Sequence, residues 1–191
     1  MAMATLSNFK TALTYGGARP ALFNLTVYIP GTFGGSTMTG VAGLNEISTV
    51  CNVSAIPPLT VTPIEKQYFG RTVKIPGDIV YGDLSTTFFN TEDYSVRNAI
   101  EVWMDKINSH SDNLGFSNNG DWVADVDLIQ YSKDGESLME YTFIDCWPTT
   151  LAEIPLSYDT ASDIEQFDVT WAYNYYTTYS SSSKISNGTH S

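Results

Sequence analysis

Residues able to perform nucleophilic or metal chemistry are few and widely spaced in this chain of 191 residues. It has two histidines, His110 and His190, and two cysteines, Cys51 and Cys146. A triad of Ser, His and carboxylate would have one plausible base and no Gly-x-Ser-x-Gly turn to hold its nucleophile. A metal site needs ligands at close spacing, which these four residues do not offer. We therefore predict no catalytic residue, no metal site and no cofactor.

Carboxylates are the remaining chemical candidates, because a glycosidase uses two of them at a defined separation. Asp145 beside Trp147, or Asp168 within an aromatic strand, would suit that role. The simpler interpretation of these carboxylates is that they lie on the solvent-exposed face of a strand. The chain has 21 acidic residues, and no pattern singles out a pair. We predict that the protein is not an enzyme.

Two further features have simple structural interpretations. The Gly-rich segment 30–46 lacks the Gly-Lys-Ser/Thr ending of a phosphate-binding loop, so it is interpreted as a long hairpin tip. Cys51 and Cys146 lie among apolar neighbours and are expected to be buried free thiols.

The negative charge is concentrated in the second half of the chain. The formal net charge is −12, and between Asp112 and Asp168 thirteen acidic residues are balanced only by Lys133. Such a field disfavours tight binding to DNA, which requires clusters of Lys and Arg. A solvated surface that aids solubility is the alternative to a functional field. A helix that spans a membrane needs about 20 apolar residues. No apolar run in this chain approaches that length, so we expect a soluble protein without membrane contact.

Length and composition predict one domain that is mainly β, because Thr, Ser, Gly, Val and aromatic residues are common. Alternating apolar residues predict strands at 23–29, 47–53, 67–75, 79–89, 122–131, 138–146 and 164–176. Turns are predicted at Pro76-Gly77-Asp78 and at Lys133-Asp134-Gly135.

One segment has helical rather than alternating periodicity. Val96, Ile100 and Trp103 recur at the spacing of one helix face, which predicts an amphipathic helix over 92–109. Asn90 or Thr91 is the predicted N-cap. Trp103 is therefore expected to be a core residue of a helix that covers a sheet.

The segment from Cys146 to Tyr176 is the most informative part of the chain. Every second residue from Phe167 to Tyr175 is apolar, which predicts a strand with one buried and one wet face. We interpret it as an assembly surface, because strict alternation favours a sheet core or a subunit seam.

This segment resembles the C-terminal part of the tail tube proteins of contractile-tailed bacteriophages. The residues that match are Trp147, Pro148, Thr149, Glu153, Leu156, Asp159, Ile164, Phe167, Val169, Thr170 and Tyr175. The likeness continues in order through Ala18-Arg19-Pro20-Ala21-Leu22-Phe23, Ala55-Ile56-Pro57, the central strand pair and the helix with Trp103. Departures from the family are a Gly-rich insertion at about 31–46 and a Ser-rich extension at 177–191.

The resemblance implies two packed antiparallel sheets with one helix, a β-barrel-like tube-protein fold, assembled as hexameric rings stacked into a hollow tube. It implies one tail-tube domain at 1–176. The implied protein is a structural part of the virion tail, assembled in the host cytoplasm, which conducts DNA inside a contractile sheath. Implied partners are further copies, the sheath protein, the baseplate or hub, the tail terminator and a tape measure protein, with double-stranded DNA passing without tight binding.

The acidic excess then suggests a hypothesis about the lumen, where like charge would keep phosphates from adhering. Asp125, Asp127, Glu140 and Asp168 are the candidate lumen-facing acids, because each lies on the polar side of an alternating strand. The candidate family-motif and assembly strand comprises Trp147, Pro148, Phe167, Val169, Trp171 and Tyr175.

Two other functions remain open at this stage. The tube subunit of a phage-derived contractile injection system would have the same fold and a protein cargo. A carbohydrate-binding β-sandwich would use Trp171, Tyr173 and Tyr175 to stack on sugars. It predicts a monomer or trimer that binds glycans, whereas a tube subunit predicts hexamers or filaments.

Overall fold

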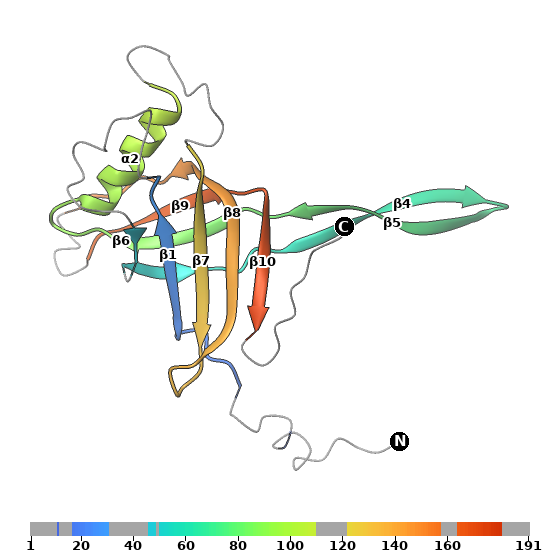
Figure 1. The fold of residues 1–191 in the computed structure, drawn as a ribbon. Coiled ribbons are helices and arrows are strands. Elements are labelled where there is room, and N and C mark those ends of the chain that lie inside the picture. Colours follow the sequence, from blue (N-terminus) through green and yellow to red (C-terminus); the bar gives the residue numbers. More distant parts are fainter. Residues whose placement is uncertain are drawn as a thin grey trace.

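A computed structural model describes residues 11, 17–30, 46–48, 50–109, 122–157 and 164–180. The strands are β1 (Phe23–Tyr28), β2 (Glu46–Ile47), β3 (Cys51–Ser54), β4 (Leu59–Tyr68), β5 (Arg71–Tyr81), β6 (Leu84–Phe89), β7 (Ala124–Tyr131), β8 (Ser137–Leu151), β9 (Gln166–Ala172) and β10 (Tyr175–Ser180), with helix α2 at Ser95–Ile107. Within the described residues, the prediction of a mainly β fold with an amphipathic helix is confirmed (Figure 1).

The body consists of two antiparallel layers that share β8 (Figure 1). One layer has the order β2-β1-β7-β8-β10, and the other has the order β8-β9-β6-β3. The first part of β8 pairs with β7 and β10, and the part from Trp147 onward pairs with β9. The change of layer occurs beside Asp145, whose φ of 57° is a left-handed value that Asp tolerates better than most residues.

The core lies between the two layers, and α2 packs against it. Leu25, Val27, Leu84, Phe88, Ile100, Trp103, Val126, Phe143, Val169 and Trp171 are among its fully buried side chains. The rings of Trp103 and Trp171 lie 5.7 Å apart. Trp171 Nε1 donates to Thr86 Oγ1 at 2.8 Å, and Trp103 Nε1 donates to Trp122 O at 2.7 Å. Both indoles therefore bury a large apolar area with their N–H groups satisfied.

Strands β4 and β5 form a two-stranded arm, residues 59–81, that projects from the body (Figure 1). Among the described strands they pair only with each other, and every arm residue except Gly77 and Tyr81 is exposed. At its base Tyr81 packs on Tyr173 and Tyr176, with ring centroids 6.0 and 5.5 Å away. The base is thus fixed to the body while the outer part has no second layer.

The arm corrects the predicted strands 67–75 and 79–89. Their turn is at Phe69-Gly70 rather than at Pro76-Gly77-Asp78. Phe69 and Gly70 have φ of 45° and 76°, and two successive positive values are what a type I′ hairpin turn requires.

Pro76 and Gly77 lie inside β5 because the arm is irregular at that point. Pro76 is opposite Pro63 where the register shifts, and prolines are tolerated at bulges of exposed strands. A Cβ on Gly77 would lie 2.5 Å from Thr62 O, so glycine is required by the close approach of β4. A Pro-Gly pair marks a turn by local preference, but here it marks a bulge.

Other strands were predicted with mixed success. Those at 23–29, 122–131 and 138–146 are confirmed as β1, β7 and β8, and Gly135 has the expected positive φ of 82° in the β7–β8 turn. The strand predicted at 47–53 is divided into β2, which pairs with β1, and β3, which pairs with β6. The strand predicted at 164–176 is likewise divided into β9 and β10, which belong to different layers.

The helix begins later than predicted, and the predicted N-caps are wrong. The N-cap is Tyr94, which has φ 53° and makes no side-chain capping bond. Thr91 and Tyr94 form a turn before the helix, with Tyr94 N donating to Thr91 O at 2.8 Å. Asn90 does not cap the helix: its N donates to Glu165 O at 2.8 Å, which extends the β6–β9 pairing, and its Oδ1 has no partner among the described residues.

Several predictions fall outside the described residues. They concern the Gly-rich insertion from 31 to 45, His110, His190 and residues 181–191. The predicted extension at 177–191 begins inside β10, which runs to Ser180. Within the described part of the chain, no helix has the length and apolar character needed to cross a bilayer.

Candidate assembly and lumen surfaces

The predicted lumen acids divide between the two layers. Asp125 and Asp127 on β7 and Glu140 on β8 lie in the first layer, whereas Asp168 on β9 lies in the second. Asp168 is exposed and accepts a hydrogen bond from Thr87 Oγ1 at 2.7 Å. The structure therefore brings three of the four acids to one layer.

The wet face of the first layer is polar and contains these three acids. Strand register places Thr26, Asp127, Thr142 and Thr177 in one row, and Asn24, Ile129, Glu140 and Tyr179 in the next. Neither row faces the core, because Leu25, Val27, Val126, Leu128 and Phe143 alternate with them and are buried. The strands β1, β7, β8 and β10 contain no Lys or Arg, so the only charged side chains of these strands are acidic.

Local contacts hold two of the acids in place. Asp127 Oδ2 accepts from Tyr28 OH at 3.1 Å, and its Oδ1 is buried without a partner among the described residues. Asp125 Oδ1 accepts from the backbone N of Asp145 at 3.4 Å, where β8 changes layer. The carboxylates are therefore fixed features of the face.

The predicted assembly strand is mostly core. Pro148, Phe167, Val169 and Trp171 are buried, so their side chains cannot contact another copy. Trp147 is half-buried and packs edge-on against Trp122 at 5.2 Å, and Tyr175 is exposed. The burial of these four side chains favours the sheet core over a subunit seam, and the part of this strand in assembly stays a prediction. Because Trp171 is buried, it cannot stack on a sugar, which argues against the carbohydrate-binding alternative.

The remaining chemical candidates have structural roles. Asn174 Nδ2 donates to Asp145 Oδ2 at 2.8 Å, which ties the β9–β10 corner to β8. Both cysteines are free thiols. Burial raises the pKa of Cys51 to about 12. Burial, with the charges of Asp125 and Asp145, also raises the pKa of Cys146, so both thiols are protonated near neutral pH. No group of three His, Cys, Asp or Glu residues within the described ranges has the geometry of a metal site.

The outer half of the arm has two unlike faces. Cross-strand pairing places Ile64 with Ile75, Lys66 with Val73, and Tyr68 with Arg71 on one side, which we term the apolar face of the arm. The opposite side has Gln67 with Thr72 and Glu65 with Lys74, the last two joined by an ion pair of 3.1 Å. Sequence reasoning missed this surface, although the alternation on each side of Phe69-Gly70 was a usable signal.

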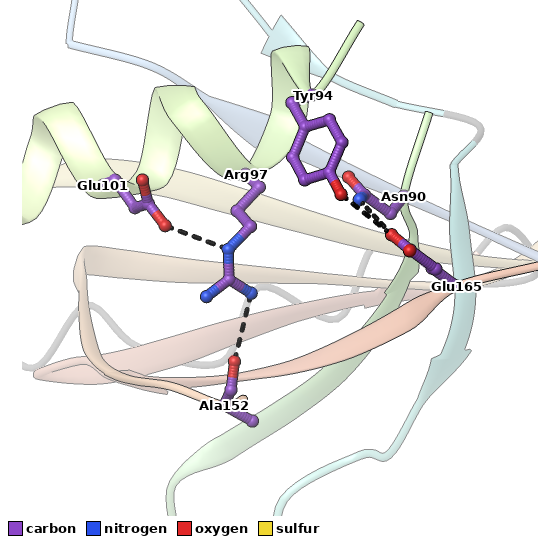
Figure 2. Close-up of polar contacts among 6 residues, drawn as sticks. All are labelled: Asn90, Tyr94, Arg97, Glu101, Ala152 and Glu165. Carbon is purple, nitrogen blue, oxygen red and sulfur yellow. Dashed lines mark hydrogen bonds and ion pairs between the residues drawn. The ribbon is translucent and has the colours of Figure 1, made fainter. Parts of the chain in front are cut away.

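A surface pocket of about 410 Å³ lies at the N-terminal end of α2. It is lined by Asn90, Thr91, Glu92, Tyr94, Ile164 and Glu165, and we term it the α2 pocket. Figure 2 shows Asn90 and Tyr94 converging on Glu165 Oε2, with bonds of 2.8 Å from Asn90 Nδ2 and 3.2 Å from Tyr94 OH. These contacts join the end of β6, the cap of α2 and the segment before β9.

Arg97 fixes α2 beside this pocket (Figure 2). It pairs with Glu101 at 2.9 Å and donates to Ala152 O at 3.1 Å. Its guanidinium also lies 5.5 Å from the Phe167 ring centre. The helix end is therefore held rigidly against β9 and the segment after β8, which keeps the pocket in shape.

Comparison with known proteins identifies relatives over most of the chain. The family model described as phage tail tube protein matches residues 18–179. The tail tube protein of Serratia phage KSP90 is 25% identical over 167 residues, which cover 86% of this chain and 92% of that protein. Tail tube protein gp19 of Enterobacteria phage T4 is 24% identical over 127 residues, which cover 66% of this chain and 78% of that protein.

Solved structures share the fold at low sequence identity. A chain from the six-fold symmetrised baseplate of the anti-feeding prophage has a TM-score of 0.63 and 8% identity, covering 85% of this chain and 95% of that one. A chain from the sheath-tube complex of the PVC extracellular contractile injection system has a TM-score of 0.57 and 17% identity, covering 92% of this chain and 98% of that one.

Proposed function

We infer that this chain, which belongs to the phage tail tube protein family, closes with five further copies into a ring that stacks into a hollow tube. Family membership confirms the resemblance recognised from the sequence, and it makes the chain a structural subunit of a tail tube. The number of copies, the lumen and the cargo are the proposed parts. The fold similarity to a chain of a six-fold symmetrised assembly supports the number six.

The observation that carries this proposal is the uncovered arm. A two-stranded ribbon is at best marginally stable in water, because it has no second layer to cover its apolar residues. The apolar face of the arm exposes Ile64, Val73 and Ile75 at its centre. Contiguous exposed apolar surface of this kind marks a protein interface. In a ring, a neighbouring copy supplies the missing layer.

The first layer supports closure around a lumen. Its outer strands leave unpaired edges: β10 pairs only with β8, and residues 23–26 of β1 pair only with β7 among the described strands. Edge pairing between copies would remove both edges and close a barrel across subunits. Four long strands from each of six copies give about 24 strands, which leaves an open channel rather than a packed interior.

The wet face of the first layer then lines the channel. Asp125, Asp127 and Glu140 face the lumen in this arrangement, and Asp168 lies on the other layer, away from it. An acidic wall without Lys or Arg repels phosphates, so double-stranded DNA passes without adhering. The named relatives are phage proteins, which favours DNA over the protein cargo of an injection system.

The outer partners follow from the same assembly. The similar PVC chain comes from a sheath-tube complex, and a further similar chain with a TM-score of 0.59 and 15% identity comes from a tube-terminating cap. We propose that this tube binds a contractile sheath, a baseplate and a terminator in the virion tail. A tape measure protein in the lumen and assembly in the host cytoplasm complete the proposal.

Electron microscopy of the purified chain tests the assembly. Across a range of protein and salt concentrations we expect six-fold rings or hollow tubes. Single particles that persist at the highest concentration would contradict ring formation, and rings of another symmetry would correct the number of copies.

A charge exchange tests the lumen assignment. The double variant Asp125→Lys with Glu140→Lys should retain double-stranded DNA that cosediments with its tubes, whereas wild-type tubes should not. Asp168→Lys is the control on the other layer, where it makes the same acid-to-base exchange at one position. DNA retention by the Asp168→Lys tubes, and none by the double variant, would reverse the choice of lumen face.

A further inference from the structure

The α2 pocket has hydrogen-bond acceptors that the described residues leave unsatisfied. Asn90 is only 9% exposed, and its Oδ1 has no partner there. Both bonds to Glu165 end on Oε2, and no described residue donates to Oε1. Asn90 Oδ1 is closed to solvent, whereas Glu165 is only half-buried, so Glu165 Oε1 is the acceptor that a charged donor from outside can reach.

The charge and rim of the pocket further define its occupant. Glu92 and Glu165 line it, and none of its six lining residues is basic. At the rim Ile164 is 66% exposed and Tyr94 is partly exposed. A positively charged donor flanked by apolar groups therefore fits this surface.

The outer half of the arm has that composition. Its apolar face includes Lys66 and Arg71, neither of which forms an ion pair within the described chain. Lys74, on the other face, is already paired with Glu65. The arm carries three of the nine basic residues and only two of the 21 acidic ones, so it is the basic part of an acidic protein.

The tip of the arm has a feature that its own fold does not explain. Phe69 is 90% exposed and has a positive φ, in a turn that favours Asn at this position. A bulky residue in the left-handed region is an outlier, and such strain persists where the residue serves a function. Tyr68 packs edge-on against it at 4.7 Å, which presents two aromatic rings together. Exposed aromatic residues beside an Arg are typical anchors of an interface.

The two surfaces lie at opposite ends of the molecule. Figure 1 shows the arm leaving one side of the body, while α2 begins at the other side. A contact between unlike surfaces at opposite ends repeats head to tail, and it closes a ring where the rotation between successive copies completes a circle. A strand of ten residues spans about 33 Å, so the arm is long enough to reach across a neighbour.

We propose that the arm tip of one copy docks in the α2 pocket of a second copy. Tyr68 and Phe69 contact the rim at Tyr94 and Ile164, and the Arg71 guanidinium bonds Glu165 Oε1. The planar fork of Arg suits a carboxylate better than the single ammonium of Lys does. This docking rests on the ring assembly proposed above and names the site that the arm occupies.

Site-directed cross-linking tests this contact. Purified Phe69→Cys protein is mixed with Ile164→Cys protein, allowed to assemble, and oxidised near neutral pH. We expect a disulfide-linked dimer that contains one copy of each variant. Phe69→Cys mixed with Tyr179→Cys is the matched control and should give none, because Tyr179 is exposed on the first layer, away from the pocket. The native thiols contribute little because Cys146 is buried and Cys51 is half-buried.

Each outcome decides the proposal. Rings that form without the Phe69–Ile164 cross-link would overturn the docking site and leave ring assembly standing. A cross-link between Phe69→Cys and Tyr179→Cys instead would overturn the docking in the α2 pocket and place the arm tip on the first layer of a second copy. Wild-type protein that forms no rings under the same conditions would overturn the docking and the assembly together.

A double-variant cycle provides a second test that does not depend on cysteine chemistry. Arg71→Gln and Glu165→Gln should each raise the protein concentration needed for half-assembly about tenfold, and the double variant should be little worse than either. Gln at 165 still accepts from Asn90 and Tyr94, so the fold is retained. Lys74→Gln on the opposite face is the control and should have little effect. Fully additive effects of the two changes would contradict a direct contact.

Discussion

The body and the arm are built from the same kind of strand, yet only the body covers its apolar residues. In β9, Phe167, Val169 and Trp171 alternate with polar residues and are fully buried. In the arm, Ile64, Val73 and Ile75 also lie on one face, but each remains about half exposed. The difference is the second layer, which the body has and the two-stranded arm lacks.

This contrast shows what alternation does and does not determine. A period of two decides which side chains share a face, because successive residues point to opposite sides. It does not decide whether the covering layer comes from the same chain or from another copy. For the body that layer is the facing sheet and α2, and for the arm we propose a neighbouring subunit.

The largest expected effect is on the body. Trp171→Ala should lower the free energy of unfolding by about 3–5 kcal/mol, because it leaves a cavity beside Trp103 and removes the bond to Thr86. Urea unfolding of dilute, unassembled protein measures this loss. Tyr175→Ala, an exposed position only four residues further along, should change stability by less than about 1 kcal/mol. Equal losses at both positions would mean that the body and its surface are not separated as described.

The arm should show the opposite behaviour. Ile75→Asp should leave the unfolding of dilute protein within about 0.5 kcal/mol of wild type, because its side chain packs on no other layer. Assembly should be lost, since a charge would be buried at the interface. Thr72→Asp, on the polar face of the arm, is the control and should assemble. Light scattering follows assembly, and a large stability loss in Ile75→Asp would show that the arm belongs to the body's core.

A third variant separates the stability of the arm turn from its role in assembly. Phe69→Asn creates the Asn-Gly pair that a type I′ turn prefers, so the arm itself should become more stable by about 1 kcal/mol. Assembly should nevertheless weaken several-fold, because an interface anchor is removed. Amide hydrogen exchange in the arm and the concentration for half-assembly measure the two effects. Stronger assembly of this variant would show that Phe69 is not an anchor.

The smallest expected effect concerns pH and the body. Burial raises the pKa of Cys51 from 9.0 to about 12, so the fold favours the neutral thiol. Its contribution to stability is fully present below pH 9 and decreases as the pH rises toward 12. The melting temperature should therefore fall less steeply between pH 9 and pH 11 in Cys51→Ala than in wild type, as followed by circular dichroism. Identical slopes would indicate that this thiol is not desolvated in the folded protein.

Local patterns predicted the strands of the body well. The β7–β8 hairpin was recognisable because the Lys133-Asp134-Gly135 turn and the flanking alternation agree. The helix was recognisable because Val96, Ile100 and Trp103 recur at helical spacing, and these three are buried as expected. Its start was misplaced because Asn90 looks like an N-cap, whereas a distant segment at Glu165 engages that residue.

The predicted site depended more on contacts between distant segments. Three of the four predicted lumen acids share a face, since β7 and β8 are neighbours joined by a short turn. Asp168 follows the same alternation but lies on the other layer, because β8 changes partner near Asp145. No local pattern marks that change. The α2 pocket was missed for the same reason, since Asn90 and Glu165 are 75 residues apart.

The sequence alone determined that the chain is mainly β with an amphipathic helix and that its acids are concentrated in the second half. It also determined that the chain belongs to a tail tube family. These properties depend on periodicity, composition and ordered motifs, all of which are local or additive along the chain. Only the tertiary structure decided which motif residues are core, which acids share a face, and that residues 59–81 leave the body as an arm. Those outcomes depend on pairing between segments far apart in the chain, where a single change of partner moves a strand from one layer to the other or leaves it uncovered.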